Sequence, residues 1–337
     1  MKRILYIGNF ISNHTRYVGA SEVLLYLLEK EGYNIQKASH KKNKFLRLLD
    51  MMLKVISLRK SIDVIIIDTF STTNFYYALM VSQLSRLFKI PYIPILHGGN
   101  LPKRLKNDAY LSSLIFKNAK TLVAPSHYLK YEFEKKAYSV QYIPNTIPIG
   151  DYKYQNRKLI KPKLLWLRAF EKTYNPTMAI EVLRKLLNEY PSASLCMVGP
   201  TRDETLELSK DLVKRYQLES QVQFTGVLSK KEWHTLSEKF DIFINTTTVD
   251  NTPVSVIEAM ALGLPIISTK VGGMPYLIEH QKEGVLVTSR DVNAMVAAII
   301  TMIENPVYAN YLAMNARKKV EQFDWKVVKE AWNKVLN

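Results

Sequence analysis

Short apolar runs alternate with longer stretches of helical spacing along the 337 residues of the chain. Between the runs, apolar residues recur about every 3.6 positions, as at 21–30, 74–88 and 176–189. Continuous apolar strands that alternate with amphipathic helices are typical of parallel sheets covered on both faces. The two sets of runs predict an α/β chain with two doubly wound, Rossmann-like domains. The runs lie at 3–8, 64–68, 91–96, 121–124, 140–144, 163–167, 194–199, 222–226, 241–245, 265–269 and 284–288.

The stretch 143–163 separates the two sets, since it contains prolines and many polar residues and has no helical period. The predicted domains are therefore an N-terminal domain over 1–155 and a C-terminal domain over 156–320. An amphipathic helix over 321–337 ends the chain, and we expect it to pack back on the N-terminal domain.

Composition and charge narrow the function classes. The chain is 47% hydrophobic, and its apolar runs fall well short of the ~18–20 residues that a membrane span needs. One cysteine excludes an internal disulfide framework, and the six histidines show no zinc spacing. The formal net charge is +17, and residues 1–150 carry most of it. Such a basic half favours an anionic partner, although a merely solubilising face is the alternative.

In open parallel sheets, ligands bind at the carboxyl ends of the strands, so the loops that follow strands should carry function. Four such loops are unusual in length or composition. They are the polar loop from Gly8 to about Ser21, "HGGN" at 97–100, "RAFEKTYNP" at 168–176 and "TTTVDNTP" at 246–253.

The last of these loops leads into "DNTPVSVIEAMALGLPIISTKVGG" (250–273). Thr252 is a favourable N-cap and Pro253 suits the first helical position. A helix is therefore predicted to run to about residue 262, with Gly263 as its stop. The N–H groups and positive dipole end at the start of such a helix favour anions.

Two acids stand eight residues apart in this stretch. Glu258, farther along the predicted helix, can accept two hydrogen bonds from a ribose diol. Asp250, in the preceding loop, can accept from another polyol. The spacing suits a ligand with a sugar at each end and phosphate between them, while the alternative is a core helix whose acids are solvated.

Arg168 and Lys172 follow a buried strand four residues apart, and they would share one face if the segment were helical. Fixed cations of this kind can compensate the charge of a leaving diphosphate. The alternative is ordinary surface cations. Because both residues are expected on a polar loop, replacing either of them should change folding little. His97 places an imidazole at a strand end in the other domain, although a lone histidine is more often structural.

These residues together resemble a known family. The pattern Arg168-x3-Lys172, "MVG" at 197–199, "FTG" at 224–226, Asp250-x7-Glu258, "EAMALGLPIIST" and "VGG" is similar to the GT4-type retaining nucleotide-sugar glycosyltransferases of the GT-B fold. "APSHYLK" and "YIPNTI" at 124–130 and 142–147 also resemble that family. The likeness covers nearly the whole chain and is strongest over 160–290.

The resemblance implies a role for each matching residue. Asp250 would lie by the donor sugar, Glu258 would hold the nucleotide ribose, and Arg168 with Lys172 would grip the diphosphate. His97 would face the donor sugar from the N-terminal domain. The remaining positions implied at the nucleotide-sugar site are Gly19, Gly199, Thr225, Asn251, Thr252, Pro253 and Val254. The sequence departs from the family pattern at Asp250, where Glu is usual, and at Tyr276, where an acid is frequent.

The implied activity is transfer of a sugar, with retention, from a UDP- or GDP-sugar to a glycan or lipid-linked acceptor. Bacterial surface polysaccharide or glycolipid synthesis is the expected setting, in the cytoplasm, with no resident cofactor and no metal ion. One alternative is a nucleotide-sugar epimerase of the same fold. Another is a basic nucleic-acid-binding module, although the chain has no zinc-finger spacing, RNA-binding signature or Lys/Arg tail.

The stretch 37–60 carries eight basic residues and one acid, Asp50. Its apolar residues recur at spacings of three and four and predict an amphipathic helix from Phe45 onward. Cations at the edges of an apolar stripe suit an anionic membrane surface, on the inner face of the plasma membrane in this setting. The alternative is that the stripe is ordinary core and the cations are solvated. The stripe consists of Phe45, Leu46, Leu48, Leu49, Met52, Leu53 and Ile56.

Overall fold

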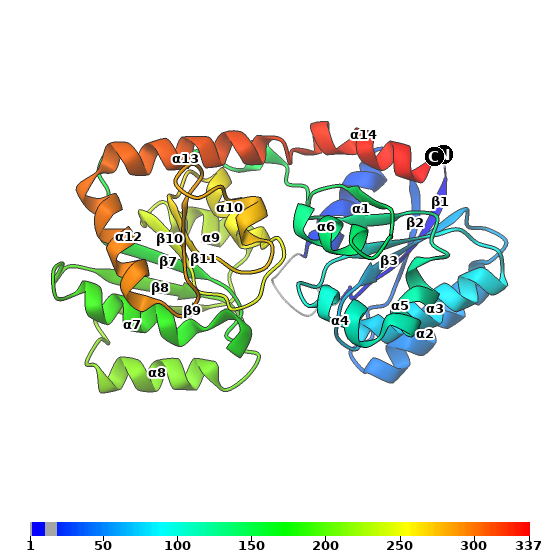
Figure 1. The fold of residues 1–337 in the computed structure, drawn as a ribbon, viewed down its shortest axis with the longest axis horizontal. Coiled ribbons are helices and arrows are strands. Elements are labelled where there is room, and N and C mark those ends of the chain that lie inside the picture. The colour runs from blue at the N-terminus through cyan, green and yellow to red at the C-terminus, as the bar shows by residue number, and fades with distance from the viewer. Residues whose placement is uncertain (1, 11–18) are drawn as a thin grey trace. The chain divides into compact units, whose positions relative to one another are not determined.

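The computed structural model describes residues 2–10 and 19–337 and divides the chain into two compact units (Figure 1). Unit 1 is Met1–Ile147 together with Trp325–Asn337, and unit 2 is Pro148–Asp324. The chain first passes from one unit to the other inside the stretch 143–163, a few residues ahead of the boundary predicted after residue 155. The predicted loop from Gly8 to Ser21 lies partly outside the described residues, because 11–18 are not among them.

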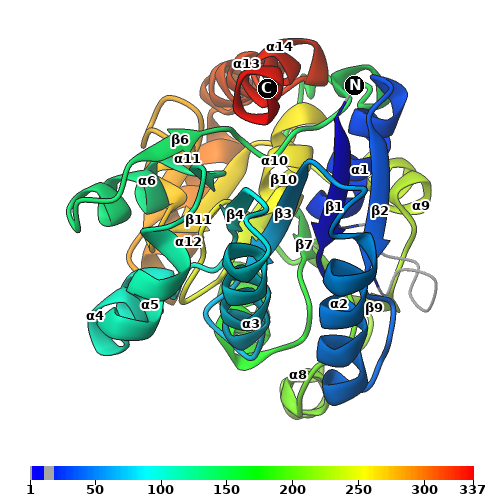
Figure 2. The ribbon, with the colours of Figure 1, turned by 90° about the vertical axis from the view of Figure 1, so that its right-hand side faces the viewer.

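Unit 1 is built on a parallel sheet with the strand order β2-β1-β3-β4-β5-β6. Its strands are β1 (Arg3–Ile7), β2 (Asn34–Ala38), β3 (Val64–Thr69), β4 (Tyr92–Leu96), β5 (Leu122–Ala124) and β6 (Val140–Tyr142). Its first helices are α1 (Ala20–Lys30), α2 (Lys44–Leu58), α3 (Asn74–Leu87), α4 (Leu101–Asn107), α5 (Ala109–Phe116) and α6 (His127–Glu134). On one face of this sheet, α2 packs beside α3 (Figure 2).

The other face of the same sheet is covered by α1 and by the terminal helix α14 (Trp325–Leu336). Trp325, Val328 and Trp332 of α14 are buried in one cluster with Ile4 and Tyr6 of β1. A hydrogen bond of 3.0 Å from the Trp325 indole to Glu31 also holds α14 on unit 1. Residues far apart in sequence thus complete one core, which gives β1 and β3 the burial on both faces that their continuous apolar runs predict.

One strand escaped the sequence prediction. β2 has the sequence Asn-Ile-Gln-Lys-Ala, and only its last residue is buried. It lies at the edge of the sheet and pairs with β1 alone. An edge strand leaves much of its surface in water and therefore needs no continuous apolar run.

Unit 2 repeats the architecture with the order β12-β11-β10-β7-β8-β9, again parallel throughout. Its strands are β7 (Lys163–Leu167), β8 (Ser194–Val198), β9 (Val222–Gly226), β10 (Ile242–Asn245), β11 (Ile266–Thr269) and β12 (Val285–Val287). Its α-helices are α7 (Pro176–Leu186), α8 (Thr205–Arg215), α9 (Lys230–Ser237), α10 (Val254–Ala261), α11 (Met274–Leu277), α12 (Val292–Glu304) and α13 (Pro306–Glu321). Two 3₁₀ helices, η2 (Ile149–Asp151) and η3 (Lys172–Tyr174), lie in its loops.

The predicted fold class is confirmed: each predicted apolar run overlaps a strand, and both sheets are doubly wound. In each sheet the order reverses at one point, between β1 and β3 in unit 1 and between β7 and β10 in unit 2. Ligands of open α/β sheets bind outside the carboxyl ends of the strands at such a switch point. Within the described part of the chain, no single helix meets the length and hydropathy of a membrane span, and α12 with α13, bent by 104°, meets them only as a pair.

Candidate functional site

Arg168 and Asp250 meet at the switch point of unit 2. Arg168 directly follows β7, and Asp250 lies in the loop after β10, the neighbouring parallel strand. The Arg168 Nη2 and Asp250 Oδ2 atoms are 2.5 Å apart, and the two side chains are only 12% and 10% exposed. The Arg168 guanidinium also lies 3.9 Å from the centre of the Tyr174 ring. A buried ion pair that also stacks on an aromatic ring is held in one geometry.

Burial dominates the electrostatics of this pair. It raises the pKa of the Asp250 carboxyl above its ordinary value, although the Arg168 charge acts in the opposite direction. The Arg168 Nε–H is buried and has no hydrogen-bond partner among the described residues. The pair therefore keeps donor capacity that an anionic ligand could use, since a buried donor without a partner is costly.

The "VGG" that the sequence singled out fixes the loop that carries Asp250. The Gly273 N–H donates a hydrogen bond of 3.0 Å to the Asp250 carbonyl. A Cβ on Gly272, whose φ is +49°, would stand 2.1 Å from the same carbonyl oxygen, and one on Gly273 would stand 1.9 Å from the Asn251 oxygen. Two glycines are needed because the backbones approach more closely than any side chain permits.

The predicted helix after Asp250 is α10, and Gly263 follows its end with a φ of +77° as expected. Its N-cap is Pro253 rather than the predicted Thr252, so the helix starts at Val254. The reason is local: Pro253 has an extended ψ of 120°, which keeps it outside the helix. Asn251, just ahead, is buried.

Glu258 lies in α10 and is 4% exposed. Its Oε1 atom accepts a hydrogen bond of 2.7 Å from the Tyr152 hydroxyl and lies 2.9 Å from the Lys230 ammonium. Tyr152 comes shortly after the passage between the units, and Lys230 opens α9. A pocket of about 360 Å³ adjoins them and is lined in part by Tyr152, Lys230 and His234. Neither partner of Glu258 could be predicted from local spacing, since both contacts join distant segments.

Lys172 does not lie on one helical face with Arg168. The segment between them is not helical, because Phe170 pairs with Thr201 in an isolated bridge. The Lys172 side chain is 73% exposed and forms an ion pair with Glu204 at 2.5 Å, which raises its pKa. Arg168 and Lys172 were predicted to share one face only if the segment between them were helical, and it is not. Lys172 is an exposed cation in this structure.

Gly199 and Thr225 lie at the same edge of the sheet, at the ends of β8 and β9. The Gly199 N–H donates to the Gly226 carbonyl at 2.9 Å. A Cβ on Gly199 would stand 1.8 Å from the carbonyl oxygen of Arg168. Gly199 thereby fixes the backbone that presents Arg168.

In unit 1, His97 follows β4, and its Nε2 atom lies 2.9 Å from the Asp68 carboxylate. Gly19 is the N-cap of α1 and receives the Glu22 carboxylate on its N–H at 3.1 Å. Asp68 is the penultimate residue of the buried strand β3, next to the switch point. Its place in the apolar run 64–68 predicted only a core strand and no site residue.

Two doubly wound units, with paired charges at a switch point, define a class of fold that comparisons with known proteins identify as GT-B. HepE from Anabaena, solved in complex with UDP and glucose, superposes with a TM-score of 0.78 at 20% identity, over 100% of this chain and 99% of its own. The predicted GT-B fold is thus confirmed.

The family follows from the second unit. The profile described as "Glycosyl transferases group 1" matches residues 152–319, and the chain belongs to this family. An uncharacterized glycosyltransferase of Haemophilus influenzae is 29% identical over 160 residues, 47% of this chain and 44% of that protein. The amylovoran biosynthesis glycosyltransferase AmsK of Erwinia amylovora is 33% identical over 110 residues, 31% and 27% of the two chains. The match thus spans less than half the length of either curated relative.

Proposed function

We propose that this protein is a glycosyltransferase that takes a sugar from a nucleotide-diphosphate sugar. The observation that carries the proposal is the buried Arg168–Asp250 pair at the switch point, with Glu258 in the helix that follows. A cation with an unpartnered donor suits a diphosphate, and two carboxylates suit the hydroxyls of sugars on either side of it. The solved complexes of HepE with UDP-glucose and with UDP support a nucleotide-sugar donor.

In this proposal Arg168 stabilises the leaving diphosphate, Asp250 orients the donor sugar and Glu258 binds the ribose. The N–H groups at the start of α10, at Val254, lie at the end of a helix where anions are favoured. Lys172 is exposed and reaches the diphosphate only if it leaves Glu204. The absence of a metal ion from the reaction stays a prediction, and chelator should leave turnover unchanged.

The transfer retains the anomeric configuration. The acceptor attacks the face from which the diphosphate leaves, and the leaving phosphate takes up the acceptor proton. The protein then acts by positioning and by stabilising developing charge. The test is the ¹H NMR coupling constant of the product anomeric proton, and an inverted product would contradict this part of the proposal. Conversion of the donor sugar to its epimer without any acceptor would instead support an epimerase.

Substitutions of Glu258 and of Asp250 should have different effects on nucleotide binding and on sugar transfer. Glu258→Gln keeps the shape of the side chain but loses the charge that favours ribose hydroxyl donors. We expect it to weaken nucleotide binding by about 1.5–3 kcal/mol, the scale of a charged hydrogen bond. Asp250→Asn should lower transfer much more than it lowers affinity for the free nucleotide.

Isothermal titration with UDP and GDP, together with turnover of the matching sugar nucleotide, measures both effects. A matched control is Glu204→Gln, which removes an exposed acid of the same unit. Equal losses of nucleotide affinity in the Glu258 and Asp250 variants would contradict the division of roles.

The acceptor is proposed to be a glycan or lipid-linked molecule at the cytoplasmic face of a membrane, in surface polysaccharide or glycolipid synthesis. The similarity to AmsK, an amylovoran biosynthesis glycosyltransferase, supports a glycan acceptor. The surface of α2 supports the position at a membrane. Its core face is formed by Arg47, Met51 and Val55, while a second apolar face lies toward solvent. Along that face Phe45, Leu46, Leu49, Leu53 and Ile56 are 74%, 51%, 44%, 54% and 37% exposed.

Most of the apolar stripe is therefore not core, contrary to the ordinary-core alternative; Leu48, which packs partly against the core of unit 1, is an exception. Exposed basic residues precede and follow the stripe, at Lys41, Lys42, Lys44, Arg59 and Lys60. An apolar helix face bordered by cations is complementary to an anionic bilayer surface.

Vesicle flotation tests this membrane surface. The protein should float with anionic liposomes at low salt, release at high salt and ignore neutral ones, since each cation near the surface contributes about 1 kcal/mol and is screened. Reversing Lys41, Lys42 and Lys44 to Glu should abolish flotation.

The control reverses three exposed lysines of α4 and its neighbourhood, Lys103, Lys106 and Lys117, with the same change of net charge. Leu49→Ser with Leu53→Ser removes apolar area at constant charge and should weaken flotation as well. Equal losses in the control and the α2 variants, or a wild type that never floats, would contradict the proposal.

A further inference from the structure

Asp68 is the centre of a buried polar cluster where β1, β3 and β4 end. Its Oδ1 atom accepts from the Tyr6 hydroxyl at 2.8 Å and lies 2.9 Å from His97 Nε2. Its Oδ2 atom accepts from the Ser21 hydroxyl at 2.6 Å. Asp68 itself is 7% exposed. A buried carboxylate with three donors is fully satisfied, so its geometry is fixed.

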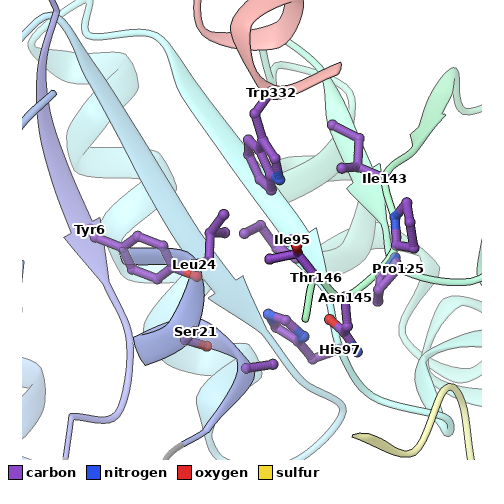
Figure 3. A pocket seen from close by; sticks show the side chains of 12 residues that line it. Tyr6, Ser21, Leu24, Ile95, His97, Pro125, Ile143, Asn145, Thr146 and Trp332 are labelled. Carbon is purple, nitrogen blue, oxygen red and sulfur yellow. The ribbon is translucent and has the colours of Figure 1, made fainter. Parts of the chain in front are cut away.

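Three elements contribute a side chain that contacts this carboxylate. The three side chains, Tyr6, Ser21 and His97, are labelled in Figure 3 beside the pocket that they help to line. Tyr6 comes from β1, Ser21 from the first turn of α1, and His97 from the residue after β4. A Cβ on Gly8 would stand 2.6 Å from Asp68 Oδ2, so only glycine at the end of β1 leaves room for this carboxylate.

The contact with Asp68 determines which nitrogen of His97 carries the proton. A carboxylate only accepts, so Nε2 must be the donor. The His97 backbone N–H donates to Thr69 at 2.9 Å, and its ring stacks on Phe70 with centroids 5.2 Å apart. Backbone, ring face and Nε2 are thus all fixed. Nδ1 makes no hydrogen bond within the described part of the chain.

The space beside the cluster is too small for a sugar. The pocket lined by Tyr6, Ser21 and His97 measures about 20 Å³, which is the room that a single water molecule needs. Asp68 is 7% exposed and is not among the residues that line this pocket. Its effect on a ligand must pass through the imidazole or through the start of α1.

We propose that Asp68 is a positioning residue of the glycosyl-transfer site. It holds His97 as the Nε2–H tautomer, which makes Nδ1 an acceptor for a hydroxyl of the donor sugar. The same carboxylate accepts a hydrogen bond from Ser21, two residues after Gly19, so that the start of α1 and the imidazole keep a constant separation. This inference rests on the proposed function only in its choice of ligand for His97.

The tautomer can be measured without any substrate. Long-range ¹H–¹⁵N correlation spectra distinguish the two ring nitrogens, and a His97→Asn variant assigns the signal. We expect His97 to carry its proton on Nε2 in the wild type and to exchange between tautomers in Asp68→Ala. Asp68→Asn provides a second variant of nearly native shape if the alanine variant fails to fold. A wild-type His97 protonated on Nδ1 alone would overturn the proposal, whatever the protein transfers.

Kinetics then test the role in transfer. Asp68→Ala should lower kcat by roughly 10²-fold with little change in KM for the donor, the scale of a misplaced catalytic group. In a His97→Ala background the same change should lower kcat no further, because the two residues act as one unit.

Tyr6→Phe is the matched control. It removes another donor to the same Oδ1 atom but leaves the His97 contact, so it should retain kcat even if it lowers stability. Fully additive losses in the double variant, or a Tyr6→Phe loss equal to that of Asp68→Ala, would reduce Asp68 to a structural residue. A protein inactive on every sugar nucleotide, yet with the Nε2–H tautomer intact, would contradict the proposed function and not the positioning contact.

Discussion

Replacing Arg168 with alanine is expected to lower the turnover number by roughly 10²–10³, the usual loss when one preorganised electrostatic contact is removed. The reason is the position of the guanidinium. It is held at the switch point of unit 2 by Asp250 and by the Tyr174 ring, and so does not have to reorganise when charge develops on a leaving diphosphate. The measurement is transfer or hydrolysis of UDP- and GDP-sugars at saturating donor.

The same substitution should also lower the free energy of unfolding, which the sequence alone did not lead us to expect. Asp250 would lose the Arg168 charge, which opposes the burial-driven rise of its pKa. Removing one partner of a buried ion pair costs about 3 kcal/mol, because the other charge stays buried. Adding Asp250→Asn should recover part of that stability without recovering turnover.

Lys172→Ala is the control for the Arg168 variant. The Lys172 side chain is exposed and pairs with an exposed acid, so its removal should change stability by less than about 0.5 kcal/mol. Wild-type turnover in Arg168→Ala would refute the assignment of the diphosphate contact. A turnover loss in Lys172→Ala as large as in Arg168→Ala would show that Lys172 leaves Glu204 when the donor binds.

The central strands could be predicted from the sequence because burial on both faces favours a continuous run of apolar residues, which is visible locally. β3 is buried at every position, and its first four residues, 64–67, form the continuous apolar run that is typical of a strand buried on both faces. β2 has no such apolar run. It lies at the edge of the sheet, and four of its five residues are at least partly exposed. The gap between residues 8 and 64 was therefore assigned no strand, although β1 pairs with β2 along its whole length.

The candidate site, too, could be predicted where it depends on local sequence and not where it depends on contacts between distant segments. Arg168, Asp250 and Glu258 were found because loops at strand ends and helix starts are visible as local spacing. The partners of Glu258 were not, because Tyr152 and Lys230 reach it across 106 and 28 positions of sequence. In unit 1, Asp68 likewise reaches His97 across 29 positions. A spacing of four suggested a shared face for Arg168 and Lys172, but it presupposed a helix that the Phe170–Thr201 bridge prevents.

Gly199→Ala is expected to be among the most damaging single substitutions in unit 2. Gly199 has a φ of +150°, a region that L residues rarely adopt, and its new Cβ would stand 1.8 Å from the Arg168 carbonyl oxygen. The clash is with backbone, so no side-chain rotation relieves it. We expect the free energy of unfolding to fall by roughly 3 kcal/mol or more, since strain and overpacking act together.

Two other glycines separate these causes. Gly226→Ala meets a φ of +69° but open space, and should cost about 1 kcal/mol from backbone strain alone. Gly150→Ala meets neither strain nor contact, and should stay within about 0.5 kcal/mol. Chemical denaturation of the three variants gives the ranking, and turnover of the folded fraction gives its functional consequence. If Gly199→Ala loses no more stability than Gly226→Ala and keeps its turnover, the loop that carries Arg168 can shift to make room for the added Cβ. The position of Arg168 is then not fixed by its backbone, and the preorganisation on which the diphosphate contact depends must come from Asp250 and Tyr174 alone.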